Sequence, residues 1–225
     1  MGIVTGLAAI NKAIEPNTNQ NFDQKGRWLQ LKDGQSMKIR FLQEIDPDSP
    51  NYNKDAGLGI VGIEHTNPKD YKRKAVCTME DEGQCFGCEQ HHRNPKGGWK
   101  GKRRFYANVL VDDGKEEPYV AIMSQGTGPK SATQEIVAYA VETESITNVN
   151  WKLKRSGDGT TTEYNIIPLP IKDAAPIDFT KYEVYDLEKL AVRDLPYSEQ
   201  EEYFKGEVKE EEENIIISDS SSVEW

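Results

Sequence analysis

The sequence predicts a mainly β protein with a few helices, an α+β fold, and three observations support this class. Short segments in which apolar and polar residues alternate recur along the chain, separated by turn signals such as Asp33-Gly34. One segment, residues 131–144, has an apolar stripe with helical spacing. The 225 residues are 36% hydrophobic, which allows one moderate core with polar loops around it. No apolar run approaches the ~20 residues that cross a membrane, so no membrane partner is expected.

The first predicted element is an N-terminal arm, residues 1–24, with a short helix over 2–14 that ends before Pro16. Strands are predicted over 27–32 and 36–42, joined as a hairpin across Asp33-Gly34. The outer face of this hairpin combines a ring with three cations: Trp28, Lys32, Lys38 and Arg40.

The remaining elements follow from the same signals. Strands are predicted over 58–65, 71–77, 102–111 and 118–124, with a last hairpin of 146–154 and 160–169. Helices are predicted over 86–93, 131–144, 185–192 and 198–204.

All three cysteines lie in one pattern, His65-x11-Cys77-x7-Cys85-x2-Cys88. A Cys-x-x-Cys pair allows two thiolates to reach one tetrahedral ion from a single turn, and a third Cys with a His closes the shell. The pattern therefore predicts a structural Zn²⁺ site and a reducing, cytoplasmic setting. His91 and His92 compete for the place of fourth ligand, but the interpretation favours His65. A zinc deaminase is excluded because its His-x-Glu signature is missing after His65.

Charge is unevenly distributed along the chain. The net charge is -10, and residues 199–225 contain ten acidic residues and two lysines, which leaves -2 for residues 1–198. Residues 93–104 hold six basic and no acidic residues. The acidic end predicts a largely disordered tail that binds partners, and the residues expected to do so are Glu210, Glu211, Glu212, Glu213 and Trp225.

Alternation in 102–111 predicts that Phe105 points into the core, while Arg104 and Tyr106 point into a groove. Cations that neutralise phosphates beside rings that stack on bases are what single-stranded nucleic acid binding requires. The candidate contact residues are Tyr106, Arg104, Lys102, Arg103, Lys100, Trp99, Tyr71, Lys72, Arg73, Lys74, Trp28, Lys38 and Arg40.

These features together resemble one family. They are Trp28…Leu31-Lys32-Asp33-Gly34…Ile39-Arg40-Phe41-Leu42, the order of His65, Cys77, Cys85 and Cys88, the run Lys102-Arg103-Arg104-Phe105-Tyr106-Ala107-Asn108-Val109-Leu110-Val111, and the acidic tail. Over roughly residues 27–170 the chain resembles the T-even phage type of single-stranded DNA-binding (helix-destabilising) protein.

The resemblance implies an OB-fold, a five-stranded barrel, over residues 25–198, with a zinc subdomain inserted at about 63–101 and a disordered acidic tail over 199–225. It implies that the four His and Cys residues bind zinc, that Tyr106 and its basic neighbours line a DNA cleft, and that the tail recruits replication and recombination proteins. The chain departs from the family pattern in residues 1–24, where Lys12 is the one basic residue. Since the type member uses a basic segment there for cooperative filaments, a monomer or weak self-association is expected.

The predicted function is sequence-independent binding of single-stranded DNA in phage replication, recombination and repair, in the cytoplasm of the infected bacterial host. An enzyme is not expected, because no nucleophile–base group, phosphate-binding glycine loop or carboxylate pair stands out in the sequence. The alternative is a zinc-stabilised protein-interaction adaptor that works through its acidic tail and does not bind nucleic acid.

Overall fold

The computed structural model describes residues 28–112, 114, 117–170, 172, 178 and 181–206. The predicted arm with its helix over 2–14, and the tail beyond residue 206, lie outside these residues. The chain divides into two compact units. Of the described residues, unit 1 takes 28–64 with 102–194, and unit 2 takes 65–101 with 195–206.

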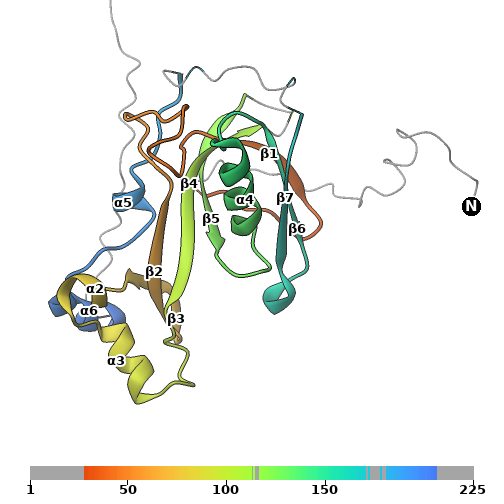
Figure 1. Ribbon diagram of the computed structural model, residues 1–225. Helices are drawn as coiled ribbons and strands as arrows, with labels where there is room; N and C mark the ends of the chain where they lie inside the picture. Colours follow the sequence, from red (N-terminus) through yellow and green to blue (C-terminus); the bar gives the residue numbers. More distant parts are fainter. Residues whose placement is uncertain are drawn as a thin grey trace, which may run out of the picture. The chain divides into compact units, whose positions relative to one another are not determined.

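The protein is mostly β with a few helices, as the alternation predicts. The strands are β1 (Ser36–Phe41), β2 (Ile60–Asn67), β3 (Asp70–Val76), β4 (Lys102–Asp112), β5 (Tyr119–Gly126), β6 (Trp151–Ser156) and β7 (Glu163–Pro168). They form an open sheet in the order β3-β2-β4-β1-β6-β7, with β5 paired to β4 (Figure 1). The pairings of β4 with β1, β2 and β5, and of β6 with β1 and β7, are all antiparallel.

Within the described residues, four of the five α-helices lie at predicted positions, and α2 (Met79–Glu82) is a short helix that the sequence does not predict. The other four are α3 (Phe86–Arg93), α4 (Thr133–Thr143), α5 (Leu187–Leu190) and α6 (Tyr197–Lys205), with a 3₁₀ turn η1 (Gly159–Thr161). The boundary expected at residue 199 between core and tail falls inside α6. Among the described residues, no helix is both long enough and apolar enough to cross a membrane.

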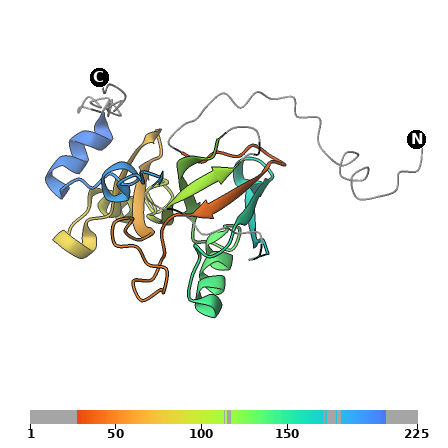
Figure 2. The same ribbon diagram turned by 90° about the horizontal axis from the view of Figure 1, so that it is seen from above.

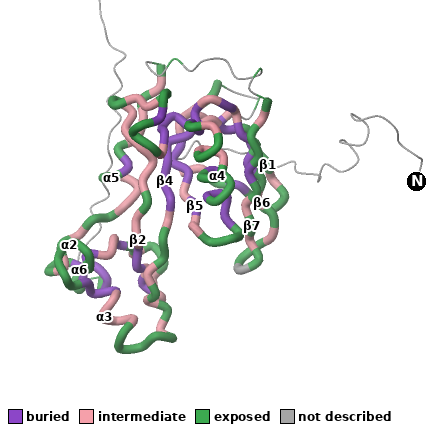
Figure 3. Tube along the Cα trace, viewed as in Figure 1, coloured by how far each residue is buried: buried purple, intermediate pink, exposed green. Residues whose placement is uncertain are grey.

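Strand β4 organises unit 1, because it pairs with β2, β1 and β5. Figure 3 shows a continuous buried run in this strand, and it comprises Phe105 to Val109. One face of β4 enters the main core with Val109 and Trp151. Residues 185–192 cover the other face, where Tyr106 packs with Ile122 and Leu187.

The main core of unit 1 is built around Trp151, which is fully buried. Its ring meets Phe41 of β1 and Tyr139 of α4 edge-on, at centroid distances of 5.8 and 4.8 Å. Its Nε1 donates to the carbonyl of Ile146 at 3.0 Å, so the polar atom of the indole is satisfied inside the core.

The predicted hairpin of 27–32 with 36–42 is wrong. Within residues 28–32, Trp28 forms an isolated parallel bridge with Ile122 of β5, and β1 pairs instead with β4 and β6. The turn at Asp33-Gly34 is present, but the segment before it contacts β5 at Ile122 and does not pair with β1. Local turn chemistry predicts where a chain reverses, and the pairing partner is decided by the core face of the whole sheet.

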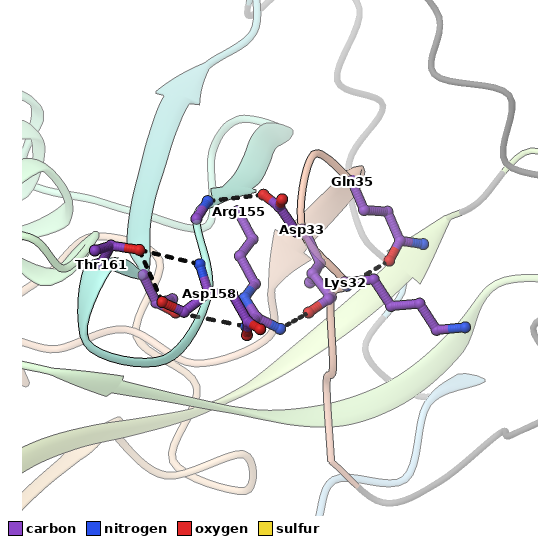
Figure 4. Close-up of polar contacts among 9 residues, drawn as sticks. Lys32, Asp33, Gln35, Arg155, Asp158 and Thr161 are labelled. Carbon is purple, nitrogen blue, oxygen red and sulfur yellow. Dashed lines mark hydrogen bonds and ion pairs between the residues drawn. The ribbon is translucent and has the colours of Figure 1, made fainter.

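The Asp33-Gly34 turn is bonded to the turn between β6 and β7 (Figure 4). The amide of Gly157 donates to Asp33 Oδ1 at 2.7 Å. The guanidinium of Arg155 donates to the carbonyl of Leu31 at 2.7 Å and to Asp158 at 3.2 Å. Two turns far apart in the sequence thereby support each other at one end of the sheet.

This arrangement makes Gly157 sensitive to substitution. Gly157 has a positive φ of 78°, and a Cβ there would lie 2.4 Å from the carbonyl oxygen of Thr161. We expect Gly157→Ala to lower the free energy of unfolding by about 1–3 kcal/mol beyond the cost of the left-handed backbone. Gly159→Ala is the matched control, because its φ is also positive but no atom lies within 4 Å of the added Cβ. Equal losses for the two variants in urea unfolding would contradict the clash.

Candidate metal centre

Four side chains of unit 2 converge on one point. His65 lies in β2, Cys77 follows β3 directly, Cys85 precedes α3 and Cys88 lies in its first turn. Their ligand atoms all lie within 4.8 Å of one another. The Cys77 and Cys88 sulfurs are 3.5 Å apart, and the Cys88 sulfur is 3.4 Å from His65 Nε2. These separations are close to the ~3.8 Å edge expected of thiolates around a tetrahedral ion with bonds of about 2.3 Å.

A hydrogen bond fixes which nitrogen of His65 faces the thiols. The Nδ1 of His65 lies 2.7 Å from the carbonyl oxygen of Trp99, and since a carbonyl only accepts, Nδ1–H is the donor. Nε2 is therefore the nitrogen that faces the sulfurs. Metal-binding histidines commonly use their second nitrogen in this way. His91 and His92, the alternative ligands, are not part of the cluster, so the structure groups His65 with the cysteines.

Gly87, between Cys85 and Cys88, allows the His65 ring to approach the start of α3. A Cβ built on Gly87 would lie 2.2 Å from His65 Cγ. Helix α3 begins directly after Cys85, whose carbonyl accepts from the amide of Glu89 at 3.0 Å. The glycine therefore forms one wall of the cradle that holds the imidazole.

Burial and mutual contacts give the thiols different acidities. Burial alone would raise the pKa of Cys85, but bonds from His65 and from the backbone at Cys88 and Thr78 lower it to about 6. Burial and the bond with Cys77 raise the pKa of Cys88 to about 12. Cys85 is thus the most acidic of the three thiols.

The cluster is closed. His65 and Cys85 are buried, and Cys77 and Cys88 are half-buried. Four protein ligands leave no open position for a substrate or an activated water, which is the arrangement of structural rather than catalytic metal sites. The cluster can hold one metal ion.

Comparison of the chain with protein-family models, curated proteins and solved structures gives no match. The role of each predicted contact residue is therefore inferred from its exposure and its contacts in the structure.

Two predictions for β4 need correction. Alternation predicts that Tyr106 presents its ring in a groove, but the residue is 2% exposed and contacts Trp28 edge-on at 6.3 Å. Burial and the carboxylate of Glu64 raise the pKa of Tyr106. Arg104 is half-buried, and its Nε and Nη2 donate to Ser124 Oγ at 3.0 and 2.8 Å. Alternation assigns Arg104 and Tyr106 to the correct face of β4, opposite Phe105. Residues 185–192 cover that face around Tyr106.

Several other predicted contact residues have structural partners. Trp99 packs on Phe86 and Phe204, and Arg73 donates to the carbonyl of Tyr203 at 2.7 Å. Lys38 is paired with Asp112. Arg40 Nε donates to the carbonyl of Thr147 at 3.0 Å.

The rest of the predicted contact residues are at the surface: Tyr71, Lys72, Lys74, Lys100, Lys102 and Arg103. Tyr71 is 73% exposed. The tail residues Glu210, Glu211, Glu212, Glu213 and Trp225 lie outside the described residues.

We predict that Gly87→Ala weakens metal binding about tenfold or more, because the new methyl occupies the space of the His65 ring. Alanine favours a helix over glycine by about 1 kcal/mol, so a loss does not come from weakening α3 itself. Competition with a metal chelator measures the change. Gln90→Ala in the same helix is the control, and unchanged affinity in Gly87→Ala would show that the cradle is not needed.

Proposed function

We propose that this protein binds single-stranded DNA without sequence preference, as a member of the T-even phage type of single-stranded DNA-binding protein, in DNA replication, recombination and repair. In this proposal unit 1 is an OB-fold, unit 2 carries a structural Zn²⁺, and the acidic tail regulates binding and recruits partners. The protein acts in the infected bacterial host.

Strand order supports the OB-fold. Five strands are neighbours in the order β5-β4-β1-β6-β7, and α4 is the helix between β5 and β6 in the chain. Five-stranded Greek-key sheets of this kind are the framework of OB-folds. Residues 42–101, which include unit 2's first segment, are then an insertion between the first two of these strands.

The donor set supports zinc. Three thiols and one imidazole nitrogen within 4.8 Å of one another suit a tetrahedral ion with soft to borderline character. Carboxylate-preferring cations such as Mg²⁺ and Ca²⁺ do not suit these ligands. His65, Cys77, Cys85 and Cys88 would hold the ion, and its contribution is to the folding of unit 2.

The observation that carries the binding proposal is a set of six exposed cations without partners, namely Lys72, Lys74, Lys96, Lys100, Lys102 and Arg103. Within the part of the chain that the structure describes, no ion pair or hydrogen bond engages their charged groups. Four of them follow one another closely, in the loop after α3 and at the start of β4. In a protein of net charge -10, unpaired cations concentrated in this way favour a polyanion such as a phosphate backbone.

Tyr71 supplies the exposed ring that the proposal requires. It lies on β3 next to Lys72, and β3 is the edge strand of the sheet. Bases stack on such rings irrespective of sequence, at about 1–3 kcal/mol per base. Tyr71 therefore takes the role that sequence alone gave to Tyr106.

Titration of the protein with oligo-dT, followed by Trp and Tyr fluorescence, tests the proposal. We expect affinity to fall steeply with salt. The double variant Lys100→Ala with Lys102→Ala is expected to make the slope of log affinity on log salt shallower by ~0.7 for each phosphate that is no longer neutralised. Lys130→Ala is the control, since Lys130 is paired with Glu163 at 3.1 Å.

Absence of oligonucleotide binding at modest salt would overturn the proposal and favour the adaptor alternative. The same titration on a chain ending at Gly206 tests the tail. Residues 207–225 carry seven acidic residues and one lysine, so their removal is expected to raise affinity if they compete with DNA. Unchanged affinity would exclude that competition.

We predict that Tyr71→Ala weakens binding of oligo-dT by about 1–3 kcal/mol. Tyr71→Phe is the matched control, because it keeps the ring and is expected to bind like the unmodified protein. Thermal unfolding of both variants is expected to be unchanged, since the side chain is 73% exposed. Full affinity in Tyr71→Ala would remove this residue from the interface.

A further inference from the structure

Helix α6 belongs to unit 2, although more than ninety residues of unit 1 separate it from the rest of that unit. Figures 1 and 2 both show α6 beside α3, and α6 also contacts β3. The side chain of Gln200 in this helix is fully buried. Sequence reasoning missed this residue, since a glutamine in a charged segment gives no local signal of burial.

Gln200 is bonded to the segments that carry two of the cysteines. Its Oε1 accepts from the amide of Phe86, the residue after Cys85, at 3.0 Å. Its Nε2 donates to the carbonyl of Val76 and to Thr78 Oγ1, both at 3.2 Å, and these residues flank Cys77. The side-chain amide of Gln200 therefore links the segment around Cys77 to the segment that follows Cys85.

A hydroxyl extends this network. Thr78 Oγ1 donates to the carbonyl of Gln84 at 2.7 Å, and Gln84 precedes Cys85. The Nε2 of Gln200 also lies 3.1 Å from the carbonyl of Leu195, which ties the start of α6 to the same centre.

The histidine segment is tied to α6 as well. Asn67, two residues after His65, donates from Nδ2 to the carbonyl of Phe204 at 2.7 Å. The ring of Phe204 meets that of Trp99 at 5.0 Å, and the Trp99 carbonyl accepts from His65. Phe204 also stacks on Phe86 with an interplanar angle of 17°. Helix α6 thus contacts the chain next to His65, Cys77 and Cys85.

We propose that Gln200 is a positioning residue for the metal ligands, and that metal binding and the docking of α6 on unit 2 are coupled. The ligands must be held in one geometry to bind an ion tightly, and Gln200 fixes the backbone on either side of Cys77 and after Cys85. Coupling is reciprocal, so an ion that fixes these segments also stabilises the surface on which α6 docks. This inference rests on the metal site of the proposed function but not on DNA binding, so the oligo-dT titration and the metal experiments below can fail separately.

The first experiment measures Zn²⁺ affinity of the full chain by competition with a chromogenic chelator. Gln200→Ala is expected to weaken binding about 10–100-fold, as is typical when a group supporting a metal ligand is removed. Gln134→Ala is the control, because Gln134 is an exposed glutamine on helix α4 of unit 1. Affinity of Gln200→Ala within twofold of the unmodified chain would overturn the positioning role.

Substitution of Co²⁺ for Zn²⁺ separates positioning from general loss of stability. At saturating Co²⁺, the ligand-field absorption of Gln200→Ala is expected to shift relative to the unmodified chain, because the ligands take a different geometry. Weakened affinity with an identical spectrum would mean that Gln200 contributes only to stability, and it would overturn the positioning role.

The second experiment needs no variant. Hydrogen exchange of the unmodified chain is compared with Zn²⁺ and after its removal by chelation. Amides of α6 are expected to lose protection in the metal-free chain, while amides of α4 keep theirs, because α4 lies in unit 1. Equal protection of α6 in both states would show that it docks independently of the metal and would overturn the coupling.

Discussion

The convergence of His65 and three cysteines on one point is the constraint on which unit 2 depends. Its buried apolar core consists of Ala75, Phe86, Tyr203 and Phe204, which is small for a unit that, within the described residues, holds three helices and strand β3. Units of this size commonly need a metal or disulfides in addition to a core. The cluster of His65 with three cysteines can hold a metal ion, which would join β2, the end of β3 and the start of α3 at one point.

Unit 1 has a different source of order. Strand β4 is bonded along both edges and covered on both faces, so its backbone and most of its side chains are used for structure. Tyr106 and Asn108 show this clearly. The Asn108 side chain exchanges two hydrogen bonds with the backbone of Tyr185, at 2.8 and 3.0 Å, and holds the covering segment over Tyr106. The alternation of β4 suggests that Asn108 lies on a binding face, but its side chain instead holds residues 185–192 against the strand.

The proposed interface lies where side chains remain free of structural roles. Rings and guanidinium groups inside a covered face cannot meet a ligand, whereas exposed lysines without partners meet solvent and phosphate alike. Lys72, Lys100 and Lys102 are exposed and their charged groups have no partner among the described residues, and the ring of Tyr71 is exposed as well. Nucleic acid recognition without base specificity needs no more than such cations and rings, held by a scaffold that does not itself contact the bases.

The sequence by itself determined the mainly β class, most element positions and the members of the His and Cys cluster, because alternation, helical spacing and Cys-x-x-Cys spacing are local properties. It also determined on which side of β4 Tyr106 lies. Only the tertiary structure decided what covers that side, since the covering residues come from 185–192, far along the chain. The same holds for Gln200, which reaches Phe86 across 114 positions. Periodicity assigns a side chain to a face, but whether that face meets solvent or another segment depends on long-range packing.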